Sequence, residues 1–177
     1  MSALERLASL TAHGIPPDTI WGGKAELTQA EVAALLSGCT RFQTALMMGK
    51  HCLDVSARHS AWSYWFRWCM AQRWETKVLG QIERFSIVTL DEFFDPRQCP
   101  TCNGAGEVMF GPKVVVCESC HGQPVQPYSD RRIAKAIGMR EHLTREWQDR
   151  LQWARDNLAE QERQAENRVR RNARDPA

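Results

Sequence analysis

Residues Cys99 to Gly122 read CPTCNGAGEVMFGPKVVVCESCHG and hold two CxxC pairs, Cys99 with Cys102 and Cys117 with Cys120. Because a CxxC turn lets both sulfurs face one ion, two such turns supply four thiolates in a tetrahedral arrangement. Four thiolates around zinc leave no position for water, so we expect a structural site. Metal binding of this kind contributes about 10–16 kcal/mol, enough to fold a segment that has no core. We therefore predict one structural Zn²⁺ bound by these four cysteines.

Disulfides and redox chemistry are the competing interpretations of the cysteines. The total of seven is odd and no export signal is visible, which favours metal over disulfides. A redox CxxC usually occurs singly and in an alternating strand–helix setting, which is absent here. His121 is an alternative ligand, although its adjacency to Cys120 makes the geometry awkward. Cys39, Cys52 and Cys69 lie in apolar helical contexts and are expected to be ordinary buried thiols.

Two short apolar runs lie between the CxxC pairs. Val108–Phe110 and Lys113–Val116 flank Gly111-Pro112, which predicts a short hairpin. Gly104 and Gly122 follow the two pairs, where the backbone must turn back under the metal without a Cβ clash.

Upstream of the cysteines the sequence predicts helices. Thr28, with Glu31 three residues later, fits a capping box for a helix that Gly38 ends or bends. The segment from Cys39 to Met48 continues as helix, closed by Gly49. Further along, apolar residues at steps of three and four predict one or two helices over 55–94. They are Trp62, Trp65, Phe66, Cys69, Val78, Ile82 and Phe85.

Downstream of the cysteines, Ser129 and Asp130 favour the start of another helix, and Gly138 suits a sharp turn that needs positive φ. Two helices joined by a short turn are typical of a DNA-binding helix-turn-helix. Thr144 occupies the position where an apolar residue is expected after such a turn, which indicates an irregular one. The second helix carries an apolar stripe of Leu143, Trp147, Leu151, Ala154 and Leu158.

In a helix-turn-helix the second helix enters the major groove, where arginine and glutamine can read guanine and adenine edges. The expected DNA-reading side chains are Arg145, Gln148, Asp149 and Gln152. The expected phosphate contacts are Arg131, Arg132 and Arg140. The alternative is an amphipathic helical hairpin held by pairs such as Glu141–Arg145 and Glu146–Arg150.

Composition narrows the class of protein. A hydrophobic fraction of 43% with seven tryptophans favours a packed core over disorder. Since no run approaches the ~20 apolar residues of a membrane span, we expect a soluble cytoplasmic protein without a membrane partner. No catalytic constellation emerges, so neither an enzyme nor a small-molecule substrate is expected. The net charge is only +2, with a modest basic excess at the C-terminal end, where Arg168, Arg170, Arg171 and Arg174 fit either phosphate contacts or a solvated tail.

The expected fold class is mostly α, a helical body with an inserted four-cysteine, zinc-ribbon-like loop and a helix-turn-helix-like DNA-binding region. The expected segments are an irregular N-terminal arm over 1–24, the helical body over 25–98, the zinc-binding loop over 99–124, the helix-turn-helix-like region over 125–164 and a charged tail over 165–177.

The order of these features resembles the lambda-type phage late-gene antitermination protein Q family. Gly49-Lys50-His51 resembles a Gly-Lys-His element of that family, and Lys77-Val78-Leu79 precedes a helix that leads into the cysteines. The paired knuckles and Tyr128-Ser129, which opens a region containing Trp147, complete a resemblance over roughly residues 42–158. This chain departs from the family at Gln123-Pro124, in place of a second glycine, and in its longer charged tail.

The resemblance implies a phage protein that acts in the bacterial host. Such a protein binds double-stranded DNA at a late promoter, loads onto paused RNA polymerase that retains its primary sigma factor, and promotes read-through of terminators. Lys50 and His51 would be surface groups that contact phosphate or polymerase, or are solvated.

Two other functions fit the same motifs. A zinc-containing helix-turn-helix repressor or activator would act at initiation only. A chaperone-like protein-binding zinc module is the second, because the CxxCxGxG half is shared with J-domain chaperones. That class normally needs more than one such zinc site.

Overall fold

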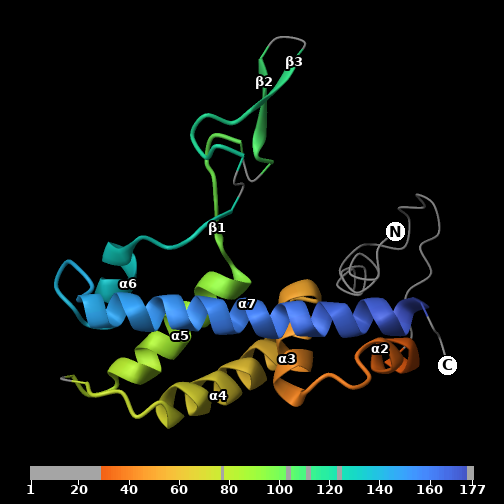
Figure 1. Cartoon of the computed structure of the whole chain (residues 1–177), viewed down its shortest axis with the longest axis horizontal. Coiled ribbons are helices and arrows are strands. Elements are labelled where there is room, and N and C mark those ends of the chain that lie inside the picture. The colour runs from red at the N-terminus through yellow and green to blue at the C-terminus, as the bar shows by residue number, and fades with distance from the viewer. Residues whose placement is uncertain (1–28, 77, 103–104, 111–112, 123–124, 175–177) are drawn as a thin grey trace. The chain divides into compact units, whose positions relative to one another are not determined.

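The computed structural model describes residues 29–76, 78–102, 105–110, 113–122 and 125–174 (Figure 1). Six helices lie within these ranges and the strands are short, so the expected mostly α fold class is confirmed. The chain forms two compact units, residues 1–74 with 154–177, and residues 75–153. The expected arm over 1–24 and the Thr28 cap lie outside the described residues.

The first unit contains α2 (Gln29–Leu35), α3 (Arg41–His51), α4 (Val55–Ala71) and the later part of α7 (Arg145–Arg174). Side-chain caps fix the starts of α3 and α4. Thr40 and Gln43 form a capping box at α3. Asp54 accepts hydrogen bonds from the first amides of α4. The prediction that Gly49 closes α3 was wrong, because Gly49 is buried inside the helix and its carbonyl accepts a hydrogen bond from Arg58 Nε at 2.9 Å.

An aromatic core holds α3 against α4. Trp65 is fully buried, and its ring stacks on Phe42 with centroids 6.1 Å apart. Leu46 and Cys69 are also fully buried in this unit. Burying an aromatic side chain removes a large apolar area from water and dominates core energetics. The helical spacing of Trp65 and Cys69 in the sequence therefore corresponds to the buried face of α4.

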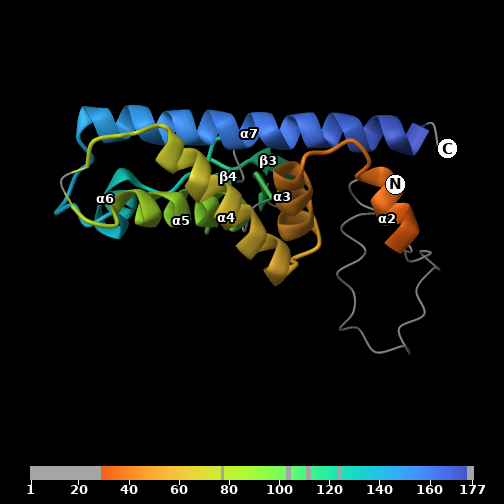
Figure 2. The same cartoon turned by 90° about the horizontal axis from the view of Figure 1, so that it is seen from below.

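The C-terminal part of α7 packs beside α2 and α3 (Figures 1 and 2). Ala165 and Val169 are fully buried against Leu36 and Met47. The amide of Asn172 donates to the carbonyls of Ala34, Leu35 and Ser37. Residues 165–174 therefore continue a helix instead of forming a tail, which corrects the sequence-based expectation for this segment.

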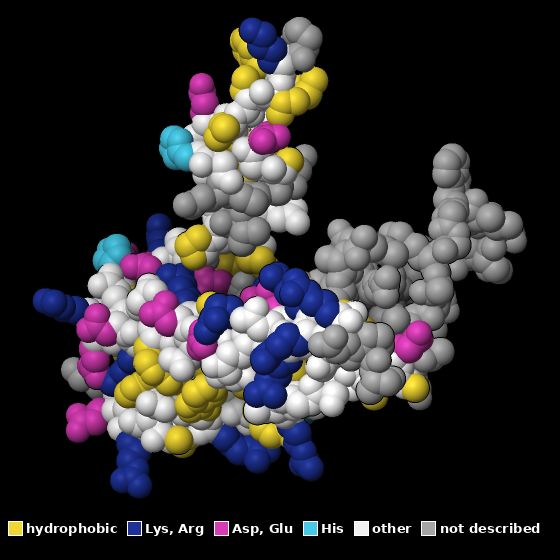
Figure 3. All heavy atoms as spheres, turned by 45° about the vertical axis from the view of Figure 1, so that its right-hand side comes forward, with side chains coloured by type: hydrophobic (Ala, Val, Ile, Leu, Met, Phe, Trp, Pro, Cys, Tyr) yellow, Lys and Arg dark blue, Asp and Glu magenta, His cyan; other side chains and the backbone are white. Residues whose placement is uncertain are grey.

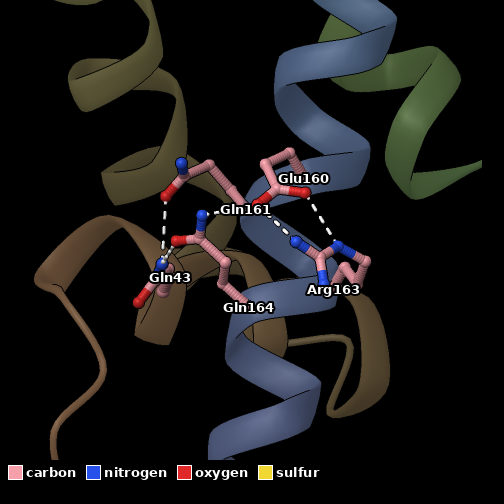
Figure 4. Close-up of polar contacts among 5 residues, drawn as sticks. All are labelled: Gln43, Glu160, Gln161, Arg163 and Gln164. Carbon is pink, nitrogen blue, oxygen red and sulfur yellow. Dashed lines mark hydrogen bonds and ion pairs between the residues drawn. The ribbon is translucent and has the colours of Figure 1, made fainter.

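A polar ladder also joins α3 to α7 (Figure 4). The buried amide of Gln43 donates to Gln161 Oε1 at 3.1 Å and to Gln164 Oε1 at 3.0 Å. Glu160 accepts two hydrogen bonds from Arg163 on the same helix. A buried amide must have hydrogen-bond partners, so this ladder fixes the register of the two helices.

The second unit contains α5 (Gln81–Phe94), α6 (Asp130–Ala136) and the first residues of α7. Its core joins Phe85 and Trp147, whose ring centroids lie 5.3 Å apart. Ile133 and Ile137 are fully buried here. The predicted apolar stripe is buried at every position, in this unit as Leu143, Trp147 and Leu151 and in the first unit as Ala154 and Leu158.

Two small antiparallel pairs of strands surround the cysteines. Strand β1 (Arg97–Gln98) pairs with β4 (Val125–Gln126). Strand β2 (Glu107–Phe110) pairs with β3 (Lys113–Val116), which confirms the predicted hairpin.

The connection between α6 and α7 is longer than expected. Ser129 caps α6 by accepting from the Arg132 amide, and Gly138 has φ +81°, as the sequence predicted. However, α6 ends at Ala136 and α7 begins at Arg145. A helix-turn-helix has a turn of about 3–4 residues, so the structure does not confirm that motif.

None of the described helices combines the length and apolar character that a membrane span requires.

Candidate metal centre and nucleic-acid surface

The four CxxC cysteines come together at one buried point. The Sγ atoms of Cys99 and Cys117 lie 4.0 Å apart, and those of Cys102 and Cys120 lie 3.7 Å apart. All four sulfurs lie within 4.8 Å of one another. A tetrahedral zinc with Zn–S distances of about 2.3 Å requires sulfurs about 3.8 Å apart. The donor set and its spacing therefore fit a structural Zn²⁺.

Backbone hydrogen bonds shape the two knuckles. The Gly106 amide donates to Cys102 Sγ at 3.2 Å, and the Cys117 amide donates to the Gly106 carbonyl at 2.9 Å. Thr101 Oγ1 donates to Ser119 Oγ at 2.9 Å, which joins the two turns. Gly122 has φ +79°, a conformation that L side chains rarely adopt. The glycine predicted at this turn is therefore required by the backbone.

The thiols of the cluster differ in acidity. The backbone N–H of Cys102 donates to Cys99 and lowers the pKa of the Cys99 thiol, which favours the thiolate. Burial raises the pKa of the Cys120 thiol. Since zinc binds thiolates, metal binding at this cluster would release protons and would weaken as the pH falls.

The remaining cysteines and His121 are not among the four close ligands. His121 is exposed and does not belong to the group of four close ligands. Burial raises the pKa of Cys69 to about 12, so this thiol remains protonated and inert. Cys39 and Cys52 are half-buried, and burial raises the pKa of both thiols. Cys69 is thus a buried thiol as predicted, whereas the other two are only partly covered.

The β2–β3 hairpin, which lies between the two CxxC pairs in the chain, exposes apolar side chains. The sequence predicted these residues to form strands but did not reveal their exposure. Phe110 is 79% exposed, Met109 69% and Val114 60%. Figure 3 shows hydrophobic side chains on the surface of this hairpin. An exposed apolar patch carried by a short, two-stranded hairpin is typical of a protein interaction site.

All seven predicted DNA-contacting side chains are exposed, namely Arg131, Arg132, Arg140, Arg145, Gln148, Asp149 and Gln152. Arg132 and Gln148 contact other side chains within their unit. The Arg132 guanidinium lies 3.6 Å from the centroid of the Tyr128 ring, and Gln148 Nε2 donates to Asp130 Oδ2 at 3.1 Å. The second contact joins the start of α6 to the start of α7.

The segment before α6 is fixed by contacts that the sequence did not reveal. The Tyr128 amide donates to the buried Glu92, and the Tyr128 hydroxyl donates to the Asp95 carbonyl at 3.2 Å.

Arg150 on α7 is also buried, with its guanidinium 4.5 Å from the Trp147 ring centroid and paired with Glu146. The predicted Glu146–Arg150 pair therefore exists, and it covers the core.

Lys50 and His51 face α7 within the first unit. Lys50 Nζ lies 2.6 Å from Glu162 Oε1, and the His51 Nε2 lies 3.9 Å from the same oxygen. Burial lowers the pKa of His51. His51, Glu162 and Glu166 offer three ligand atoms within 4.8 Å of one another. Because Lys50 pairs with Glu162 and Arg170 with Glu166, both carboxylates already have cationic partners.

Comparisons of this chain with protein families, with curated proteins and with solved structures found no match.

Proposed function

We propose that this chain is a phage transcription antiterminator. It binds a DNA element at a late promoter, loads onto paused RNA polymerase that retains its primary sigma factor, and promotes read-through of terminators in the bacterial host. The order of motifs that resembles the lambda-type Q family supports this proposal, and a four-cysteine arrangement suited to zinc agrees with it.

The DNA-binding part of the proposal rests on the amphipathic character of the α6–α7 region, which has a buried apolar side and an exposed polar side. Leu143, Trp147 and Leu151 are buried, whereas Arg145, Gln148 and Asp149 on the same segment are exposed. Arginine and glutamine side chains on an exposed helix face are the groups that hydrogen-bond to base edges and phosphates. DNA binding by this face does not depend on a short helix-turn-helix turn, because the first turns of α7 carry the reading side chains.

The exposed hairpin supports the polymerase part. Polymerase presents a protein surface, and apolar side chains such as Phe110 and Met109 gain free energy when a partner removes them from water. The metal centre gives the hairpin a rigid base without a core of its own. The effect on polymerase would then be mechanical, with no chemical step.

Selection of bound fragments from a random duplex library tests the DNA-binding part. We expect a defined sequence to be enriched by the wild-type protein and not by a variant in which Arg145 and Gln148 are alanine. Arg163→Ala is the matched control, since Arg163 is an exposed arginine on the same helix. Failure to enrich any sequence would contradict sequence-specific DNA binding.

A repressor or activator that acts only at initiation is the main alternative, because it would use the same exposed face. The two functions separate in transcription, where only an antiterminator changes read-through. A chaperone-like module is disfavoured by the cysteines, since one group of four close cysteines is found in the described residues. The salt dependence of binding distinguishes a chaperone-like module from a DNA-binding protein, because counterion release weakens DNA binding steeply as salt rises.

A further inference from the structure

The last two turns of α7 carry a basic surface made of arginines for which the sequence left phosphate contacts and a solvated tail as alternatives. Residues 167–174 contain four arginines and no acidic residue. Asn167, Arg170, Arg171 and Arg174 line a common hollow in the surface. We call these four residues the α7 arginine stripe. Their spacing of three and four places them on one helix face.

The opposite side of the same turns is anchored to the first unit. Val169 is fully buried, Arg168 donates to the Gly38 carbonyl, and Asn172 donates to carbonyls at the end of α2. The helix is therefore held in place while the stripe faces solvent. An ordered array of guanidinium groups loses less conformational entropy on binding than a flexible tail.

Charge on the stripe is little compensated within the described residues. Arg170 contacts Glu166 at 3.3 Å, and Arg171 Nε donates to the Asn167 carbonyl at 3.3 Å. Among the described residues, Glu166 is the one carboxylate that pairs with these arginines. Capping of the helix dipole accounts for cations in the last turn, Arg171 and Arg174, but not for Arg170.

We propose that the α7 arginine stripe binds the phosphodiester backbone of nucleic acid. Planar guanidinium groups match phosphate oxygens in bidentate geometry, and the three arginines of the stripe are suited to consecutive phosphates. The stripe reads no base sequence, because backbone contacts carry none. The stripe belongs to the first unit, whereas the exposed side chains of Arg145, Gln148 and Asp149 belong to the second. The stripe is therefore a second nucleic-acid surface, and this proposal does not depend on antitermination.

Salt dependence of binding tests the proposal. The full-length, zinc-loaded protein is titrated by fluorescence anisotropy against random-sequence duplex DNA and against single-stranded RNA at several salt concentrations. The test variant is R170Q/R171Q/R174Q. The control is R41Q/R67Q/R163Q, which removes the same charge from exposed positions elsewhere in the first unit.

Each lost phosphate contact lowers the slope of log affinity against log salt by about 0.9 on duplex DNA and about 0.7 on a single strand. We expect the stripe variant to lose about 2–3 units of slope and the control to retain the wild-type slope. Loss on only one substrate identifies duplex DNA or RNA as the ligand, and loss on both identifies the shared backbone.

Two further variants keep the result interpretable if the triple variant fails to fold. R170K/R171K/R174K retains the charge, so most of the affinity should remain, and Arg170→Gln alone should lower the duplex slope by about 0.9. Wild-type slopes on both substrates in folded Arg170→Gln would overturn the proposal, as would wild-type slopes in a folded triple variant. The antiterminator proposal would be unaffected, because its DNA contacts lie on the other unit.

Discussion

The proposed zinc site would depend on each thiolate of the cluster of Cys99, Cys102, Cys117 and Cys120. We predict that Cys99→Ser or Cys120→Ser loses the metal, because a serine hydroxyl is a poor zinc ligand and the segment has no core to replace the lost binding energy. Elemental analysis should give one zinc in the wild type and well below one in either variant. Cys39→Ser is the control and should keep one zinc. Stoichiometric zinc in Cys120→Ser would contradict the four-thiolate assignment.

Arg145 distinguishes base reading from backbone contact. If its guanidinium binds a base edge, Arg145→Ala costs about 1–3 kcal/mol on the selected site and much less on random DNA. Titration of both duplexes measures the difference, with Arg163→Ala as control. An equal loss on the two duplexes would make Arg145 a phosphate contact.

We predict that His51 makes the stability of the fold depend on pH. Burial lowers the pKa of His51, so the folded state favours the neutral imidazole although Glu162 opposes the shift. Below the ordinary pKa of about 6.5 the unfolded chain binds more protons, so the contribution of His51 is present above that pH and is lost as pH falls.

We therefore expect His51→Gln to flatten the decrease in unfolding free energy between about pH 7 and pH 5. Chemical denaturation of wild type, His51→Gln and the exposed-site control His59→Gln measures the effect. A wild-type pH dependence in His51→Gln would show that other groups set it.

The β2–β3 hairpin exposes apolar side chains that no contact within its own unit explains. We predict that Phe110→Ser combined with Val114→Ser leaves zinc content and DNA binding unchanged, because both side chains are exposed and the four ligands are retained. Read-through should fall strongly if the hairpin contacts polymerase. The control is Leu79→Ser, a residue 94% exposed outside the hairpin. Full read-through by the hairpin variant would remove this contact from the proposal.

Local patterns predicted the elements well where local physics dominates. The Ser129 cap, the positive φ of Gly138 and the buried stripe of α7 all follow from spacing and residue type. The closeness of the two CxxC pairs could be predicted because four thiolates are needed to coordinate one zinc ion. A ligand set of this kind can therefore be recognised without any knowledge of the surrounding fold.

Elements that depend on distant contacts were not predicted. Residues 165–174 have only Ala165 and Val169 as buried apolar residues, and Asn172 bonds to carbonyls near residue 35. No periodicity signals such bonds. Gly49 remains inside α3 because tertiary contacts outweigh its low helix propensity. The eight-residue connection between α6 and α7 likewise depends on how Ile137 and Leu143 are buried.

The molecule offers three surfaces of different chemistry, which are the polar α6–α7 face, the apolar hairpin and the α7 arginine stripe. A protein that must engage both DNA and a polymerase needs separate polar and apolar contacts. Helix α7 contributes residues to both compact units, so one element carries side chains of the first face and of the stripe.

Single-round transcription with purified bacterial polymerase and its primary sigma factor tests antitermination most directly. The template carries a promoter with the DNA element selected by the protein, an early pause site and a downstream terminator. We expect terminator read-through to rise only when both the protein and the element are present. DNA binding with altered initiation and unchanged read-through would contradict antitermination and make the chain a zinc-bearing repressor or activator.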